Sequence, residues 1–181
     1  NKVEKYKDQS IDINFDTVRE LPNGLNFDNA RWGFNITGVQ HDLIEPYLNV
    51  QPHELIKDKI AIHRTFRYRN YFINYKFLNN YENLLFIGTQ DEYDDLKKEI
   101  NNLQFHNCKD FLEMTMIIKS SKFFIGNQSV AYDLAEALKI PRLLEGCPDY
   151  PVIKPHGKNA YDFFYQIHFE KWCEYLNSKN Q

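Results

Sequence analysis

The sequence has few of the residues that cross-link small secreted proteins or bind structural metals. Its 181 residues include only three cysteines, Cys108, Cys147 and Cys173, which lie far apart and form no C-x-x-C pair. The six histidines include no pair at the spacing of metal ligands. We therefore expect no disulfide and no metal site, and reduced thiols favour a cytoplasmic protein. A chain of this length buries roughly 70% of its unfolded surface, so a hydrophobic core can hold one domain together.

A large excess of charge of one sign and a long apolar run are also missing. The chain has 22 Lys and Arg against 25 Asp and Glu, a formal net charge of -3, whereas a general nucleic-acid binder is usually strongly basic. No apolar run reaches the ~20 residues of a membrane span, and the first five residues contain no apolar signal core. We expect neither a nucleic-acid partner nor a membrane span. The first residue is Asn rather than Met, which suggests a fragment or a trimmed product.

From about residue 58, short apolar runs alternate with helical patterns. The expected strands are residues 59–63, 84–88, 103–106, 122–126 and 141–145. The expected helices are residues 91–100, 111–118, 131–138 and 161–176, of which the last is rich in aromatic residues. This alternation predicts βαβ units. We therefore expect an α/β, Rossmann-like three-layer domain over residues 58–181, with a mostly parallel sheet of about five strands.

Residues 1–57 do not alternate in this way and predict an irregular N-terminal segment. Residues 11–15 alternate as a strand does, and residues 41–48 predict one short helix. Residues 21–38 contain one proline, three glycines and four asparagines, which is typical of a loop.

The turn after the strand at 122–126 is one candidate site. Gly126 permits a tight turn, and a helix that begins near Ser129 offers unpaired N–H groups to an anion. Asn127 and Gln128 add side-chain amides, and Ser129 adds a hydroxyl group. The alternative, which the spacing alone favours, is that Asn127 or Ser129 only caps the helix.

The basic loop at residues 63–70 is the second candidate site. It carries Arg64, Arg67 and Arg69 beside Thr65, directly after a strand. One guanidinium group can bind two phosphate oxygens at once, so the cluster predicts a phosphate site. The alternative is a solvated basic turn that pairs with the acidic residues at 91–95.

Other residues near the same edge of the sheet have two interpretations each. His63 is more often a structural histidine than a general base. Glu145 and Asp133 are candidates for contact with a ribose or a sugar, whereas Glu145 fits a structural salt bridge equally well. The aromatic face of the last helix packs inside the domain, or it docks onto a second domain or a second copy of the chain.

At these residues the sequence resembles the C-terminal half of a GT-B glycosyltransferase. It is similar to the ADP-heptose:lipopolysaccharide heptosyltransferase family and its divergent phage and bacterial relatives. The family's Gly–x–Asp–(Ser/Thr)–Gly–x–x–His–Leu turn matches residues 126–134, and its Ala-Ala-Leu-x-x-Pro run matches 135–141. Its earlier His–x–Thr–x–Arg loop matches residues 63–67. The resemblance covers about residues 58–145. The chain departs from the motif where the family has its acid, second glycine and histidine, at Gln128, Val130 and Asp133.

The resemblance implies a domain that holds the nucleotide and diphosphate of an activated sugar, without a metal or another cofactor. Ser129 and the N–H groups of residues 129–131 would hold diphosphate oxygens, with Thr65 and Arg67 opposite them. The full expected diphosphate and nucleotide site is Thr65, Arg67, Arg69, Gly126, Asn127, Gln128, Ser129, Val130 and Ala131. The resemblance assigns no catalytic residue to this chain.

The activity that the resemblance implies is metal-independent, inverting transfer of a sugar to an unknown glycan or protein acceptor. In GT-B enzymes the acceptor and the usual base lie on an N-terminal domain, for which residues 1–57 are too few. We therefore expect the chain alone to lack a complete active site. One alternative is a non-catalytic binding or assembly module that keeps the half-fold. Another is a nucleotide-sugar epimerase or hydrolase on a related two-domain fold.

Overall fold

The computed structural model describes residues 29–39 and 42–179, in two compact units, Asn1–His41 and Asp42–Gln181. The described part of the first unit is helix α2, Asn29–Thr37. The prediction of a loop over 21–38 is therefore wrong for these residues. Ala30 and Phe34 lie four residues apart, a helical spacing that the count of glycines and asparagines obscures. The strand predicted at 11–15 lies outside the described residues.

The second unit confirms the predicted α/β fold class. Its sheet has six strands, all parallel, in the order β3-β2-β1-β4-β5-β6. The strands are β1 (Ile60–His63), β2 (Leu84–Ile87), β3 (Gln104–His106), β4 (Phe123–Asn127), β5 (Arg142–Glu145) and β6 (Ala160–Phe163). The helices are η3 (Lys76–Asn80), α3 (Gln90–Leu96), α4 (Phe111–Ser120), α5 (Val130–Leu138) and α6 (Gln166–Ser178).

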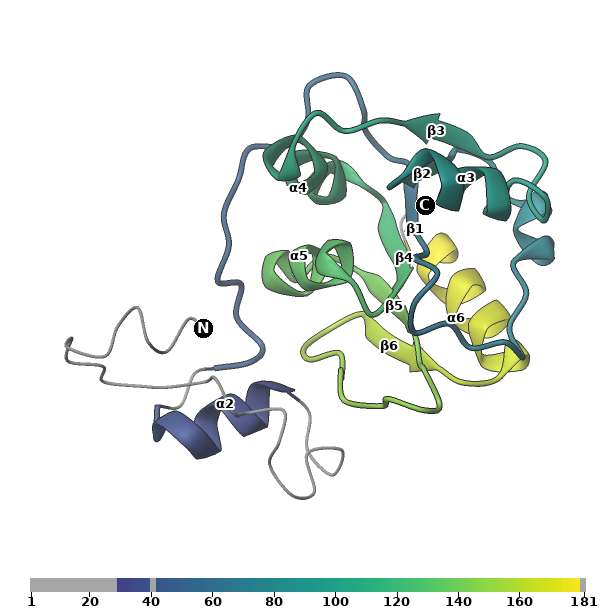
Figure 1. Cartoon of the computed structure of the whole chain (residues 1–181). Helices are drawn as coiled ribbons and strands as arrows, with labels where there is room; N and C mark the ends of the chain where they lie inside the picture. Colours follow the sequence, from purple (N-terminus) through teal and green to yellow (C-terminus); the bar gives the residue numbers. More distant parts are fainter. Residues whose placement is uncertain (1–28, 40–41, 180–181) are drawn as a thin grey trace, which may run out of the picture. The chain divides into compact units, whose positions relative to one another are not determined.

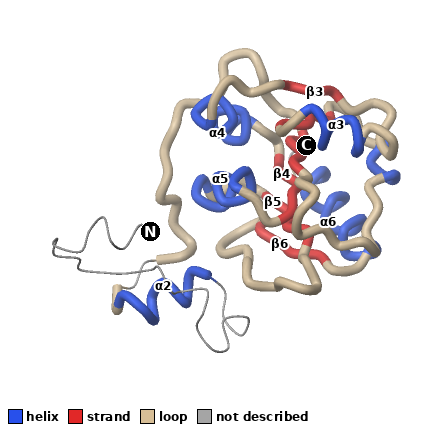
Figure 2. The backbone as a smooth tube through the Cα atoms, in the orientation of Figure 1, coloured by secondary structure: helices blue, strands red, loops and turns tan. Residues whose placement is uncertain are grey.

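Helices cover both faces of the sheet and make the three layers (Figures 1 and 2). Alternate strand residues point to opposite faces. In β1, Ile60 and Ile62 pack in a core with residues of η3 and α6, whereas Ala61 packs in a second core with residues of α4 and α5. β2, β4 and β5 are buried along their whole length, as expected for parallel strands with helices on both sides.

The sixth strand lies where the sequence predicted the start of the last helix. β6 pairs with β5, and α6 begins only at Gln166. Phe163 is buried and stacks on Phe169 of α6 with ring centroids 4.0 Å apart. An aromatic-rich run fits a strand and a helix alike, so the composition of residues 161–165 could not decide between them.

The segment from residue 42 to β1 is a strap without a helix, so the helix predicted at 41–48 is wrong over its described residues, 42–48. Tyr47 and Leu48 donate backbone hydrogen bonds to the carbonyl oxygen of Ala137, and His53 donates one to that of Met116. Leu48 and other apolar residues of the strap pack on the core beside α4 and α5. The contacts of the strap with these helices therefore replace the hydrogen bonds of the predicted helix. None of the described helices has the length and apolar character that crossing a bilayer requires.

Gly126 of β4 pairs with His63 of β1 and has no room for a side chain. A Cβ atom at position 126 would lie 2.8 Å from the carbonyl oxygen of His63 and 2.7 Å from the ring of Phe124. The packing of the sheet thus requires glycine here.

Gly126→Ala should lower the free energy of unfolding by about 1–3 kcal/mol, because the added methyl group forces a backbone shift in the centre of the sheet. Urea unfolding measures the change. Gly33→Ala is the control, since a Cβ atom there meets no described atom within 4 Å. An unchanged stability of Gly126→Ala would contradict the close approach.

Candidate functional site

The strand order reverses between β1 and β4, the kind of point at which open parallel sheets form a ligand crevice. From β1 the chain proceeds outward to β2 and β3, and from β4 it proceeds the other way to β5 and β6. The loops that leave β1 and β4 therefore diverge, and ligands of open parallel sheets bind at such a switch point, beyond the carboxyl ends of the strands. Both loops that the sequence singles out, residues 63–70 and 126–130, lie at this point.

Asn127 joins the two loops. Its Oδ1 accepts a hydrogen bond from the backbone N–H of Thr65 at 3.0 Å, and its Nδ2 donates to the carbonyl oxygens of Thr65 at 3.0 Å and Arg67 at 2.7 Å. The side chain is fully buried. Since these bonds occupy its amide, Asn127 holds the basic loop on the end of β4 rather than a ligand.

Ser129 is the N-cap of α5, as the alternative interpretation has it. Its Oγ accepts a hydrogen bond from the N–H of Tyr132 at 3.4 Å, and its carbonyl oxygen accepts from Asp133. The first N–H groups of a helix have no partner within the helix. Those of Val130 and Ala131 therefore remain for a ligand, at the positive end of the helix dipole.

Gln128 precedes this cap and is 8% exposed. Its Oε1 atom is buried and has no hydrogen-bond partner among the described residues. Such an acceptor costs about 1–3 kcal/mol when nothing donates to it. A ligand or a water molecule that donates an N–H or O–H here would remove that cost.

Arg64 and Glu145 form a buried ion pair. The Arg64 guanidinium donates to both carboxylate oxygens, at 2.8 Å from Nε and 3.0 Å from Nη2. The backbone N–H of Asn70 and the hydroxyl of Tyr75 also donate to this carboxylate, at 2.6 Å and 2.8 Å. Burial and the charge of Glu145 raise the pKa of Tyr75 well above its usual value, so the hydroxyl remains a donor.

This network corrects the expected contact between Glu145 and a ribose. The Glu145 side chain is 0% exposed, and both of its oxygens accept bonds from within the chain. Its role is the structural salt bridge, the second of its two interpretations. Residue type and position at a strand end could not separate the two, because the partner Tyr75 and the turn at Asn70 are remote from Glu145 in the sequence.

Arg69 is also engaged by the protein. It donates to Asp95 at 2.6 Å and to the carbonyl oxygens of Thr65 and Arg64, and its guanidinium lies over the ring of Phe66. The hydrogen bond from Arg69 lowers the pKa of Asp95. Arg69 therefore pairs with the acidic helix at 91–95, as the alternative for this loop states, and does not present its charge to the crevice.

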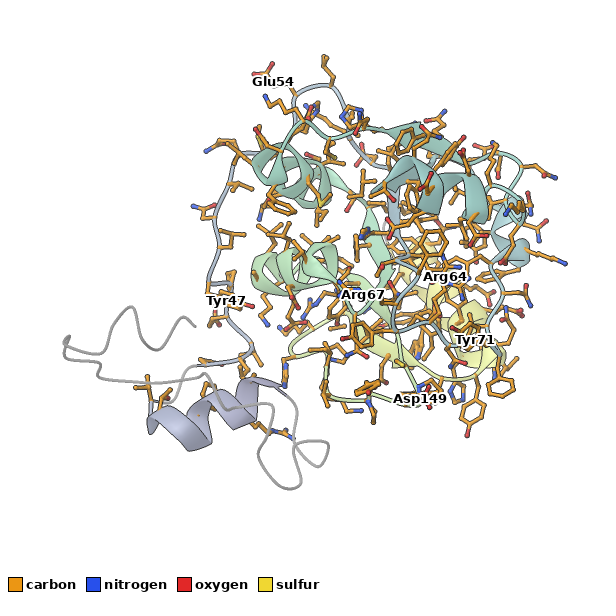
Figure 3. All side chains as sticks on the ribbon, viewed as in Figure 1. Tyr47, Glu54, Arg64, Arg67, Tyr71 and Asp149 are labelled. Carbon is orange, nitrogen blue, oxygen red and sulfur yellow. The ribbon has the colours of Figure 1, made fainter. Side chains whose placement is uncertain are left out.

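Arg67 is the arginine of this loop that stays exposed. Its guanidinium has a ring contact with Tyr68 at 5.8 Å and no ion pair with any residue that the structure describes. In Figure 3, Arg64 lies on the α6 side of the sheet and Arg67 on the α5 side. Thr65 supports Arg67, because its Oγ1 accepts the N–H of Arg67 at 3.3 Å. The hydroxyl hydrogen of Thr65 stays available to a ligand.

Two further titratable groups lie near the crevice. The Nδ1 atom of His63 lies 3.2 Å from the carbonyl oxygen of Ile87. Burial lowers the pKa of His63 to about 4, although the negative charge of Glu92 acts in the opposite direction. Its imidazole is therefore neutral at pH 7. Asp133 lies exposed in the first turn of α5, where partial desolvation and then the charge of Glu136 raise its pKa to about 6. No contact of Asp133 with the basic loop is present among the described residues.

Two tyrosines complete this edge of the sheet, and no sequence pattern points to them. Tyr68 follows β1 and Tyr150 follows β5, and their rings meet edge to face. The contact depends on β1 and β5 lying on either side of β4, which the sequence does not reveal.

A cavity of 760 Å³ opens at the other edge of the sheet. Its lining includes residues at the amino ends of three strands, Ile60, Lys122 and Pro141. Parallel sheets bind ligands at their carboxyl ends, so this cavity is not the candidate site. No group of three His, Cys, Asp or Glu side chains within the described ranges has the geometry of a metal site.

Breaking the buried ion pair should destabilise the domain strongly. Glu145→Gln leaves the buried Arg64 charge with only the more exposed Glu99, 3.7 Å away, as a counter-ion. We therefore expect a loss of about 3 kcal/mol in urea unfolding, at the low end for a broken buried pair. In the double variant Arg64→Met/Glu145→Gln the buried positive charge is absent. Its loss of stability should therefore be smaller than the sum of the losses measured for Arg64→Met and Glu145→Gln separately. Additive losses would show that the two side chains do not act as a pair.

His63 should make stability fall as the pH is lowered from 6.5 towards 4. In that range the unfolded chain binds a proton at residue 63 and the native chain does not, so protonation favours unfolding. Between pH 7 and pH 5 the wild type should lose about 1–2 kcal/mol more than His63→Asn, which keeps a donor for Ile87 but does not titrate. Equal losses in the two proteins would contradict a neutral native His63.

No model of a known protein family matches this sequence, and no curated protein matches it either. The strand order and the groups at the switch point are therefore the features of this chain that bear on its function.

Proposed function

We propose that the domain binds a nucleotide-diphosphate sugar, with the diphosphate in the crevice between the basic loop and the start of α5. The observation that carries the proposal is that two anion-binding features follow the neighbouring strands β1 and β4 at the switch point. These are the exposed guanidinium of Arg67 and the N–H groups of Val130 and Ala131. A guanidinium and a helix N-terminus both favour a doubly or triply charged phosphate group.

The reaction that suits this site is transfer of the sugar to an acceptor. An acceptor hydroxyl attacks the anomeric carbon, the bond from that carbon to the diphosphate breaks, and the nucleoside diphosphate leaves with the bonding electron pair. The hydroxyl proton passes to a base, to which this domain contributes no assigned residue. Arg67 and the helix N–H groups stabilise the negative charge that develops on the leaving group. The family resemblance supports the proposal that the reaction is sugar transfer. The basic groups at the switch point support the proposal that a diphosphate binds there.

A second candidate function is a binding module without catalysis. The network around Arg64 and the ion pair of Arg69 leave Arg67 as the exposed cation among the three arginines of the loop. Gln128 and Asp133 stand where the resembling family has its acid and histidine. A site that keeps its phosphate-binding groups and loses its reacting groups would bind nucleotides and not turn them over.

Calorimetric titration of the full chain with ADP, UDP, GDP and CDP tests the binding. At least one should bind, and Arg67→Ala should weaken it about 10–100-fold, because a charge-assisted hydrogen bond to phosphate is lost. Lys158→Ala is the control, since it removes an exposed cation near the start of β6, at the other edge of the sheet. The proposal fails if no nucleoside diphosphate binds, or if Arg67→Ala binds as tightly as the wild type.

The products formed from a bound donor separate the reactions. The chain is incubated with a nucleotide-diphosphate sugar alone, and the mixture is resolved by chromatography. Free sugar indicates a hydrolase, and a second nucleotide sugar indicates an epimerase. Binding with an intact donor leaves transfer and the binding module, which a panel of acceptor glycans then distinguishes.

A further inference from the structure

Tyr68 and Tyr150 meet across the carboxyl end of β4. Their ring centroids are 5.8 Å apart at an interplanar angle of 76°, an edge-to-face pair. Tyr68 belongs to the loop after β1 and Tyr150 to the loop after β5, and β4 lies between these two strands. The pair therefore joins the loops on either side of the strand that leads into α5.

The two rings are exposed in spite of this contact. Tyr68 is 38% and Tyr150 52% exposed. Tyr150 meets Tyr68 edge to face, and the Arg67 guanidinium lies 5.8 Å from the centroid of the Tyr68 ring. The exposed fractions show that ring surface nevertheless remains open to a ligand. Packing within the domain thus uses only part of the aromatic surface that these loops present.

The backbone holds Tyr68 in an unfavourable conformation. Its φ angle is 57°, in the left-handed region that bulky residues rarely adopt. The buried Asn127 amide holds the carbonyl oxygen of Arg67, immediately before this residue, at 2.7 Å. Strain that a buried clamp maintains is found mainly at functional sites, where it places a side chain for use.

We infer that Tyr68 and Tyr150 form a stacking platform for the base of the bound nucleotide, an assignment that rests on the proposed nucleotide function. Arg67 and Tyr68 are consecutive, so the loop presents a phosphate-binding group and an aromatic ring side by side. A nucleoside diphosphate held at Arg67 and the start of α5 has its base within reach of these rings. Tyrosine stacks on any base through the π face, so the platform tolerates different bases.

The test compares nucleotides with phosphates that carry no base. Calorimetry measures the binding of ADP, UDP, pyrophosphate and glucose 1-phosphate to the full chain. Two variants remove the rings, Tyr68→Asn, which suits the left-handed backbone, and Tyr150→Ala. Tyr68→Phe keeps the stacking surface. Tyr71→Ala is the matched control, because Tyr71 is 85% exposed on the same loop and lies apart from Arg67 in Figure 3.

Each ring-removing variant should lower the affinity for ADP and UDP about tenfold and leave the affinity for pyrophosphate unchanged. Tyr68→Phe and Tyr71→Ala should bind all four ligands as the wild type does. The inference is overturned if both ring-removing variants bind ADP and UDP normally. It is also overturned if the ring-removing variants weaken the binding of glucose 1-phosphate alone, because the pair would then be a sugar platform. Equal weakening of pyrophosphate binding overturns it too, because that result would show a change in the loop. If the wild type binds none of the four ligands and neither GDP nor CDP, the proposed function fails as well, and this outcome is distinct from the others.

Discussion

The buried pair of Arg64 and Glu145 is the interaction on which the carboxyl edge of the sheet depends. Removing two charges from water costs several kcal/mol each, and a pair survives burial only when further hydrogen bonds complete it. Tyr75 and the backbone of Asn70 supply those bonds. The pair thereby links the end of β1 to the end of β5 and fixes the turn at residue 70. A carboxylate and a guanidinium at the edge that holds the candidate site therefore belong here to the support of that site.

Asn127 extends this support to the crevice itself. It is buried at the end of β4 and binds the loop after β1 through three hydrogen bonds. Two buried polar groups, Glu145 and Asn127, thus hold the same loop from neighbouring strands. Side chains held in this way keep one geometry, which is what recognition of a charged ligand requires. The groups left for a ligand are few: Arg67, the hydroxyl of Thr65, the amide of Gln128 and two helix N–H groups.

The sheet could be predicted from the sequence because buried parallel strands are continuous apolar runs, as in β2 and β4. β6 could not, since its aromatic residues also suit the start of a helix. Helix α5 and its cap at Ser129 follow from local signals, a hydroxyl residue before a periodic apolar face. The roles of Asn127, Arg69 and Glu145 do not, because they depend on which loops the strand order brings together. Arginine next to threonine after a strand predicts phosphate binding equally for all three arginines. Arg67 is separated from the others only by the burial of Arg64 and by the ion pair of Arg69 with Asp95.

The charges at the crevice bear on what kind of anion it suits. In the proposed function, one guanidinium and the positive end of a helix, worth about half an elementary charge, would face a diphosphate that carries at least two negative charges. His63 adds no positive charge, because burial lowers its pKa to about 4. Asp133 in the first turn of α5 has a pKa of about 6, so at pH 7 it is mostly ionised and opposes an anion. These groups would therefore compensate the charge of a bound diphosphate only in part, and water or another part of an assembled site would supply the rest. Partial compensation fits a leaving group, since a site that neutralised the diphosphate fully in the ground state would have little left to offer as the charge develops in the transition state.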